Sequence, residues 1–328
     1  MGEEEPIVAH ISIYRGLDVQ DGMKVAMQDL TETGSLSRST SAVAEGGSLT
    51  DEHCQFYQEN GFLVAEQLFT TEEVQEIKEE TLEIFRGERG LIEGLQRAEA
   101  QESEAETLLK YLCIHFPHKL SPLIFKQLAH PRVTAILQRL ISPNVKAMQS
   151  MLFVKAPGKP GQSWHQDEYY IPTRDCSLTG AWIAIDDADL ENGCLWVLPR
   201  SHRPAKIYPR ASYMGGEYGE HDTIDPALFD ESEAIPVEVK AGSVIFFNGY
   251  LLHSSRRNRS KRRFRRALVC HYMSAESYLP WDQDGKFPLK EDMRDIVLVA
   301  GVDPYAHKGV EALNQAYLRP DFQRIEKP

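Results

Sequence analysis

The sequence lacks the marks of secretion, of disulfide bonding and of membrane insertion. Its five cysteines are odd in number, form no Cys-x-x-Cys pair and mostly sit among apolar neighbours, so reduced intracellular thiols fit best. The N-terminus has no basic segment followed by an apolar one, and no uninterrupted apolar run approaches the roughly 18 residues of a membrane span. The C-terminal residues form no peroxisomal tripeptide. We therefore expect a cytoplasmic protein without membrane contact.

Basic side chains are scarce relative to acidic ones. The 36 basic residues against 49 acidic ones give a net charge of −13, which repels polyanions and disfavours nucleic-acid binding. Apolar residues make up 42% of the 328-residue chain, which suffices for the core of one elaborated domain. Residues 31–50, by contrast, are rich in Ser, Thr and Gly and cannot offset the entropy of ordering. We expect a flexible N-terminal segment at 1–50 and one domain at 51–328; a phosphorylatable regulatory segment is the less favoured alternative to an inert linker.

The pattern of apolar residues changes near residue 147. Before it, Thr70 with Glu73 forms a capping box, and Pro122 and Pro131 stand at first-turn positions of two further helices. After it, short strand-like runs are separated by Gly, Pro, Asn and Asp, at 147–155, 163–168, 180–186, 193–198, 235–239, 243–248 and 266–274. This predicts a mainly β fold with flanking helices, arranged as a sandwich or jelly-roll barrel. His271, in the last run, is expected to line the core or the barrel.

A histidine and an aspartate stand two residues apart in the run 163–168. On an extended strand His165 and Asp167 would leave the same face and could chelate one ion. His253 follows another apolar strand, which antiparallel jelly-roll pairing can bring close. Two imidazoles and one carboxylate leave one face of an ion open, which suits oxygen-activating iron(II). By itself His-x-Asp is a weak signal, and the alternative is two hydrogen-bonded histidines at a strand end and in a loop.

Five segments in the second half of the chain carry motifs that favour an iron site at His165, Asp167 and His253 more strongly than the spacing alone does. They are His165-Gln166-Asp167, Ala181-Trp182-Ile183-Ala184, Glu191-Asn192-Gly193-Cys194-Leu195-Trp196-Val197-Leu198-Pro199-Arg200-Ser201-His202, His253-Ser254-Ser255 and Phe264-Arg265-Arg266-Ala267-Leu268. Together with Gly61-Phe62-Leu63-Val64, and in this order, they resemble the phytanoyl-CoA dioxygenase family over about residues 50–275. The resemblance implies a double-stranded β-helix (jelly-roll) fold that uses iron(II), 2-oxoglutarate and dioxygen, with ascorbate as an added reductant.

Carried over residue by residue, the resemblance assigns one set of side chains to the metal and another to the cosubstrate. The iron ligands, which are also the catalytic residues, are His165, Asp167 and His253, and the residues that bind 2-oxoglutarate are Arg265, Trp182, Ser255, Lys110 and Gln149. Arginine suits a carboxylate because guanidinium can donate two parallel hydrogen bonds and keeps its charge. On a strand Arg265 and Arg266 point to opposite faces, so only one can face the interior. The preceding loop is longer by one residue and more basic than in the phytanoyl enzyme itself, which leaves Arg266 open as the anchor.

The segment 256–266 holds eight basic residues among eleven, against the acidic background of the chain. One interpretation is a solvated, mobile loop. The other is a rim that attracts anions beside the metal and would suit a phosphorylated, CoA-linked or carboxylate substrate. The sequence does not decide between the two.

The resulting hypothesis is a dioxygenase that hydroxylates an unactivated carbon of a small molecule, which could be an anionic acyl-CoA, a carboxylate or a natural product. Asp167 favours hydroxylation, or a related desaturation or ring closure, because halogenating members of the family lack this carboxylate and bind chloride there. The alternative from another class is a catalytically silent jelly roll that binds an anionic ligand or a partner through residues 256–266. Neither the main substrate nor the oligomeric state follows from the sequence.

Overall fold

The computed structural model describes residues 42–43, 49–173, 175–203, 205–213, 217–218, 221–277 and 295–319, all of which belong to the unit Ser39–Pro328. The predicted flexible segment at 1–50 lies largely outside these residues. Within it, β1 (Ala42–Val43) pairs in parallel with β2 (Phe62–Ala65).

Two sheets form the core of the described part of the chain. The larger has nine strands. Beyond β1 and β2, its strands are β11 (Val244–Asn248), β6 (Thr179–Ala184), β13 (Arg265–Ser274), β4 (Val145–Lys155), β3 (Cys113–His115) and β15 (Tyr317–Leu318), in that order, with β14 (Val297–Ala300) also paired to β4. The smaller sheet has the order β10 (Ile235–Val237), β7 (Leu195–Val197), β12 (His253–Ser255) and β5 (Gln162–His165). This is the predicted mainly β jelly-roll architecture.

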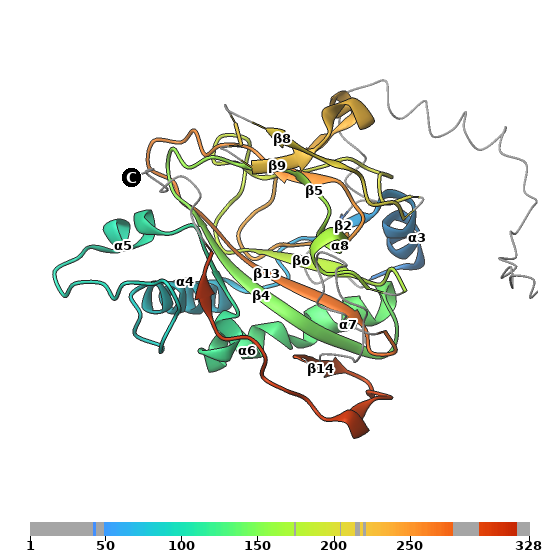
Figure 1. The fold of residues 1–328 in the computed structure, drawn as a ribbon, viewed down its shortest axis with the longest axis horizontal. Helices are drawn as coiled ribbons and strands as arrows, with labels where there is room; N and C mark the ends of the chain where they lie inside the picture. The colour runs from blue at the N-terminus through green and yellow to red at the C-terminus, as the bar shows by residue number, and fades with distance from the viewer. Residues whose placement is uncertain are drawn as a thin grey trace, which may run out of the picture. The chain divides into compact units, whose positions relative to one another are not determined.

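The central strands of the larger sheet are apolar on both faces because both faces are covered. Val244 to Phe247 are all buried, and β11 is paired with β2 on one side and β6 on the other. Figure 1 shows helices α4, α6 and α7 on one side of β4 and β13, with β5, β8 and β9 on the other side. A hydrogen bond of 2.8 Å from the Tyr272 hydroxyl to the Leu128 carbonyl joins β13 to α6. The helices cover the outer face of the large sheet, and its inner face is turned toward the small sheet.

Three of the described helices begin where the sequence predicts. The long helix α4 (Thr71–Phe85) starts at the Thr70–Glu73 capping box, and α6 (Pro122–Leu128) and α7 (Pro131–Leu140) carry proline in the first turn. The remaining α-helices are α3 (Asp51–Asn60), α5 (Glu104–Lys110) and α8 (Asp167–Tyr170), and the short 3-10 turns are Pro117–Lys119, Pro226–Leu228, Glu231–Glu233 and Ala306–Lys308. None of the described helices is long and apolar enough to cross a membrane.

One predicted strand ends earlier than expected. The run 163–168 is strand only to His165, and Asp167 begins the short helix α8, whose first turn closes with a hydrogen bond of 2.9 Å from Ile171 N to Asp167 O. Acidic residues at 167 and 168 stabilise such a turn because they lie at the positive end of the helix. Asp167 therefore reaches the site from a helix start and not from the face of a strand.

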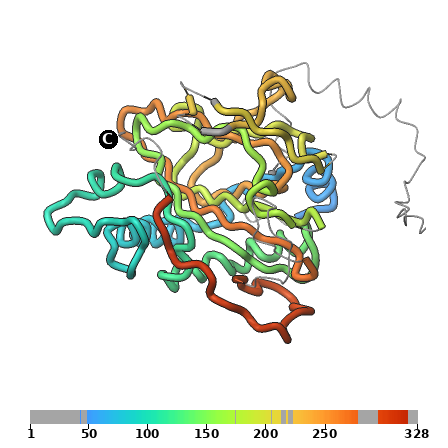
Figure 2. Tube along the Cα trace, viewed as in Figure 1, coloured from blue at the N-terminus to red at the C-terminus, as the bar shows by residue number. Residues whose placement is uncertain are grey.

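Several of the described strands were not predicted from the sequence. The hairpin β8 (Arg210–Tyr213) and β9 (His221–Ile224) lies in the segment after the small sheet's β7, and β9 is close to β5. Near the C-terminus, β14 adds to β4 and β15 adds to β3, so residues 295–319 run along the edge of the large sheet, as the red part of the trace in Figure 2 shows.

Candidate active site

Strand pairing brings the predicted metal ligands together. His165 on β5 and His253 on β12 are opposite each other in the antiparallel pair, and Asp167 follows from the start of α8. Asp167 Oδ1 lies 3.7 Å from His165 Nε2 and 3.6 Å from His253 Nε2. All three side chains are buried, and their ligand atoms lie within 4.8 Å of one another. This spacing fits atoms that surround one ion.

Backbone carbonyls fix which nitrogen of each imidazole faces the site. His165 Nδ1 is 2.7 Å from Ser163 O, and His253 Nδ1 is 2.9 Å from Leu251 O. Because a carbonyl only accepts, each Nδ1 donates its proton and each neutral ring keeps the lone pair on Nε2. Burial, and then the neighbouring His253, lowers the pKa of His165 to about 3. His165 is therefore neutral at physiological pH, the form that binds a metal.

His271 fixes the carboxylate in the same way. Its Nε2 donates to Asp167 Oδ2 over 2.8 Å, so Oδ1 is the oxygen left to face the two histidines. Burial alone would raise the pKa of Asp167, but His253, His271 and His165 together bring that pKa below its usual range. The group is an anion that offers one oxygen. Two imidazoles and this carboxylate form a donor set that fits iron(II) and leaves further coordination positions open.

A cavity between the two sheets contains these ligands and extends along β13. It is partly open to solvent at its mouth. Its lining comes from both sheets: Met151, Phe153, Gln162, His165, Asp167, Trp182, Leu195, Phe247, His253, Ser254, Ser255, Arg265, Val269 and His271. Arg265 is the first residue of β13, and His271 lies farther along the same strand. We call the part of the cavity at His165, Asp167 and His253 the metal end. We call the part at Arg265 the cation end.

The cation end holds a buried arginine without a carboxylate. Arg265 is 5% exposed, its Nε has no hydrogen-bond partner, and its guanidinium carbon lies 5.3 Å from the centre of the Trp182 ring. Among the described residues no acidic side chain forms an ion pair with it. Burial lowers the pKa of Arg265 to about 10, so it still carries its charge at neutral pH. An unpaired buried guanidinium fits an anionic ligand such as the distal carboxylate of 2-oxoglutarate.

Comparison with known proteins now identifies the family. Residues 57–267 match the sequence profile of phytanoyl-CoA dioxygenase (PhyH). The chain belongs to the phytanoyl-CoA dioxygenase family. It is 31% identical over 240 residues to the peroxisomal phytanoyl-CoA dioxygenase of Rattus norvegicus, covering 70% of this chain and 69% of the relative. It is 28% identical over 259 residues to phytanoyl-CoA dioxygenase 1 of Oryza sativa subsp. japonica, covering 70% of this chain and 91% of that relative.

Solved structures show the same fold at lower identity. The non-haem α-ketoglutarate-dependent carbocyclase SnoK from nogalamycin biosynthesis gives a TM-score of 0.59 at 24% identity, over 77% of this chain and 97% of its own. EctD from S. alaskensis with bound Fe gives 0.56 at 20% identity, over 73% of this chain and 82% of its own. As a member of the phytanoyl-CoA dioxygenase family, the protein is a non-haem enzyme that depends on iron(II) and 2-oxoglutarate.

The structure brings together most of the residues that the sequence assigned to the cosubstrate, but not all. Arg265, Trp182 and Ser255 line the cavity. Lys110 does not: it ends α5, is partly exposed and pairs with the carboxylate of Glu102, so we drop it from the proposed site. Gln149 is not in the cavity lining either. It stands opposite His271 on β4, and its amide donates to His115 Nδ1 over 3.3 Å.

The two arginines at the start of β13 point to opposite faces of the strand. Arg265 points into the cavity, whereas Arg266 points away from it and holds Asp186 with two hydrogen bonds of 2.8 and 2.9 Å. An arginine already paired with a carboxylate is a poor receptor for a second one.

The sequence analysis did not predict the contacts that three residues make at the site. His271 was expected only as a lining residue, Gln162 donates to His165 Nε2 over 2.9 Å, and Lys155 contacts Ser255. For Lys155 a signal existed, because strand alternation through 147–155 puts it on the same face as Met151 and Phe153, both of which line the cavity.

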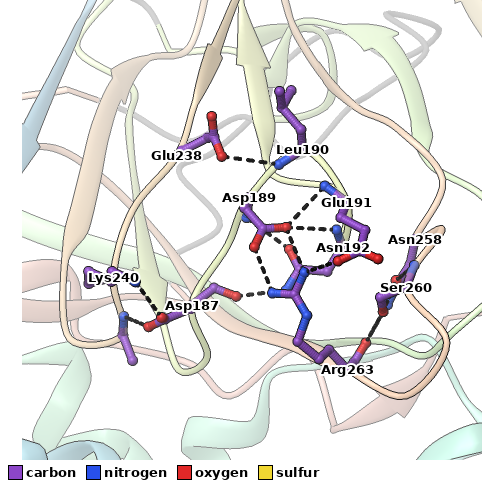
Figure 3. A network of polar contacts seen from close by, with 11 residues as sticks. Asp187, Asp189, Leu190, Glu191, Asn192, Glu238, Lys240, Asn258, Ser260 and Arg263 are labelled. Atoms are coloured by element: carbon purple, nitrogen blue, oxygen red, sulfur yellow. Dashed lines mark hydrogen bonds and ion pairs between the residues drawn. The ribbon is translucent and has the colours of Figure 1, made fainter.

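Acidic side chains of other segments contact four of the eight basic residues of the segment 256–266. Arg263 lies between Asp189 and Glu191, with contacts of 2.6 and 2.5 Å (Figure 3). Three further arginines of the segment contact acidic side chains: Arg256 with Glu231, Arg259 with Glu217 and Arg266 with Asp186. The buried Asn258 side chain donates to the carbonyls of Lys155 and Arg263 and fixes the backbone. Carboxylates of other segments therefore neutralise much of its charge.

Proposed function

We propose that this enzyme hydroxylates an unactivated carbon of a small anionic substrate. The observation that carries the proposal is the intact set His165, Asp167 and His253, with its carboxylate, in the same cavity as Arg265. Iron(II) with 2-oxoglutarate and dioxygen supplies the oxidising power. A desaturation or ring closure would use the same residues and is separated from hydroxylation by the product alone.

In this proposal each residue of the cavity has one task. His165, His253 and Asp167 hold the ion, and the Ser163 and Leu251 carbonyls together with His271 keep the three ligands in one orientation. Arg265 anchors the distal carboxylate of 2-oxoglutarate, and the Trp182 ring packs beside the guanidinium. The apolar side chains Phe153, Leu195 and Val269 line the space between and exclude water.

Arg210, on β8 between strands β7 and β10 of the small sheet, brings a guanidinium near the metal end. The Arg210 guanidinium lies 5.0 Å from the centre of the Tyr169 ring and 5.2 Å from that of Tyr170, and it donates to the Tyr170 hydroxyl. The Tyr170 ring is 6.3 Å from the ring of His165. Positive charge thus lies near the metal end, on a segment outside the jelly-roll core, where residues that select the substrate are commonly found.

Product analysis tests the proposed reaction. The purified enzyme with iron(II), ascorbate and 2-oxoglutarate is incubated with a cell extract, and mass spectrometry searches for a metabolite that gains one oxygen atom. The Asp167→Ala variant serves as the matched control, because it lacks only a ligand of the metal. A product that has lost two hydrogens instead would replace hydroxylation by desaturation or ring closure. Succinate release without any altered metabolite, or equal product from Asp167→Ala, would contradict the proposal.

The reduced thiols favour a cytoplasmic location, and we propose it for this chain, although the rat relative is named as peroxisomal. Cell fractionation with peroxisomal and cytosolic markers tests it. Cofractionation with peroxisomes would overturn it.

A further inference from the structure

A second buried cation lies beside Arg265. Lys155 is the last residue of β4, is 2% exposed and stands directly opposite Arg265 in the β4–β13 pair. Residues directly opposite each other in an antiparallel pair point to the same face of the sheet, so both cations point inward. Among the described residues, Lys155 has no carboxylate within ion-pair distance.

The hydrogen bonds of Lys155 go to neutral oxygens. Its ammonium donates to Ser255 Oγ over 2.8 Å, to Arg256 O over 2.7 Å and to Gly193 O over 3.5 Å. These bonds replace part of its hydration but do not neutralise its charge. Burial, and then the neighbouring Arg265, brings the pKa of Lys155 well below its ordinary value, so the charged ammonium is favoured when an anion is bound nearby. Two buried cations without an acidic partner are costly unless a ligand supplies the negative charge.

The orientation of the Ser255 hydroxyl follows from its two donors. Ser255 Oγ accepts from Lys155 Nζ and also from the backbone N–H of Gln162, over 3.2 Å. A hydroxyl oxygen has two lone pairs and one proton, so both acceptor positions are occupied and only the O–H remains. Because Ser255 lines the cavity, that proton is available to an acceptor inside it.

We infer that Lys155 is a positioning residue of the cosubstrate site: it holds the Ser255 hydroxyl as a donor and adds a second positive charge beside Arg265, so that the distal carboxylate of 2-oxoglutarate meets both. The inference rests on the proposed placement of 2-oxoglutarate against Arg265. Lys155 acts through Ser255 and through its charge, and no contact between its own ammonium and the cosubstrate is required.

A purely structural role is the alternative. Lys155 also ties the segment after His253 to the turn at Gly193, whose φ of +82° belongs to the left-handed region. A Cβ at Gly193 would stand 2.4 Å from Arg256 O, which shows how closely these two segments approach. A residue that only held them together would affect stability, and would affect every ligand of the cavity alike.

The test compares two ligands on the anaerobic, iron(II)-loaded enzyme by isothermal titration calorimetry. 2-Oxoglutarate has the distal carboxylate, and 2-oxobutyrate keeps the 2-oxo acid end but lacks it. Lys155→Met should weaken 2-oxoglutarate binding by roughly tenfold to a hundredfold, the range of a charge-assisted hydrogen bond, and leave 2-oxobutyrate binding unchanged. Equal weakening of both ligands, or an unchanged dissociation constant for 2-oxoglutarate, would overturn the inference.

Lys146 provides a matched control on the same strand. It is also fully buried, and it donates to the backbone carbonyls of Ala275 and Ser277 over 3.3 and 2.5 Å, at the other end of β4. Lys146→Met should lower the melting temperature without selecting between the two ligands.

Further variants test the inference if Lys155→Met does not fold. If Lys155→Met does not fold, Ser255→Ala removes the group through which Lys155 acts and should show the same ligand selectivity; unchanged 2-oxoglutarate binding there overturns the inference as well. In the double variant the losses should be less than additive, since both substitutions remove one hydrogen-bonded unit. Arg265→Ala separates the two proposals. If Arg265→Ala also leaves 2-oxoglutarate binding unchanged, the cosubstrate site itself is misplaced. If Arg265→Ala weakens 2-oxoglutarate binding and Lys155→Met does not, only the role of Lys155 is refuted.

Discussion

The two ends of the cavity have opposite chemistry. At the metal end, two imidazoles and one carboxylate present lone pairs to a common point, and backbone carbonyls and His271 fix their orientation. At the cation end, Arg265 and Lys155 are buried, and no carboxylate of the described residues forms an ion pair with either. One end needs a cation and the other an anion. Iron(II) together with a dicarboxylate satisfies both, which explains why one cavity holds both sets of residues.

Loss of a metal ligand should have the largest effect of all the substitutions, and the effect should be on iron binding at the metal end. His165→Ala or His253→Ala should abolish iron binding, because two remaining ligands cannot hold the ion against water and buffer. Anaerobic iron titration should give one iron(II) per chain for the wild type and none for the variants. Either variant with wild-type iron affinity would show that its histidine is misassigned.

Loss of Arg265 should act at the other end. Arg265→Ala should raise the 2-oxoglutarate concentration for half-maximal turnover by roughly 10²-fold or more, because removing one member of a buried charge pair costs about 3–5 kcal/mol. Iron affinity should not change. Succinate release at varied 2-oxoglutarate measures the effect.

Arg266→Ala is the control for that measurement, since Arg266 adjoins Arg265 but pairs with Asp186 outside the cavity. An unchanged cosubstrate constant in Arg265→Ala beside an impaired Arg266→Ala would move the anchor by one residue and put the facing of β13 in error.

His271 should have a smaller effect at the metal end. His271→Leu keeps the ligands but frees Asp167 Oδ2, and loss of such a supporting hydrogen bond typically lowers metal affinity about 10- to 100-fold. Competition with a chelator of known iron(II) affinity measures the change. Wild-type iron affinity in a folded variant would mean that the hydrogen bond does not orient the ligand.

Local pattern predicted the elements that are long or bounded by clear signals. The capping box at Thr70, the two first-turn prolines and the buried strands β4, β11 and β13 followed from periodicity and turn residues. Strands such as β3, β12 and β15 are two or three residues long and exist only through partners far away in the chain, so no local pattern could predict them. The strand assigned to Asp167 was wrong because two acidic residues favour a helix start there.

The site was predictable where a residue type dictates chemistry, and not where burial decides it. Histidine and aspartate at the metal end were predicted because the motifs His165-Gln166-Asp167 and His253-Ser254-Ser255, in their order with the other motifs, resemble those of a known family. Lys155 was missed because strand alternation predicts only which face of β4 it is on, and not that its ammonium is buried without a carboxylate partner among the described residues. Lys110 was misplaced because the carboxylate that pairs with it, Glu102, could not be foreseen from the sequence.

For the basic segment 256–266, too, the sequence did not show which carboxylates face its side chains. Substitution of its exposed arginines should have the smallest effect on the cosubstrate constant. The density of charge along the sequence left both a solvated loop and an anion-attracting rim open, and could not show that Glu217, Glu231 and other carboxylates face several of these side chains. Arg257 and Arg262 line no part of the cavity.

Arg257→Ala or Arg262→Ala should therefore leave the cosubstrate constant within about twofold of wild type, because an exposed charge is screened by solvent and salt. At most, either variant should weaken an anionic main substrate, and more so at low ionic strength. The measurement is succinate release at varied 2-oxoglutarate, at about 0.05 M and 0.5 M salt, spanning weak to strong screening. A cosubstrate constant raised as far as in Arg265→Ala, and insensitive to salt, would show that the segment reaches the cation end and would remove the distinction between buried and exposed cations.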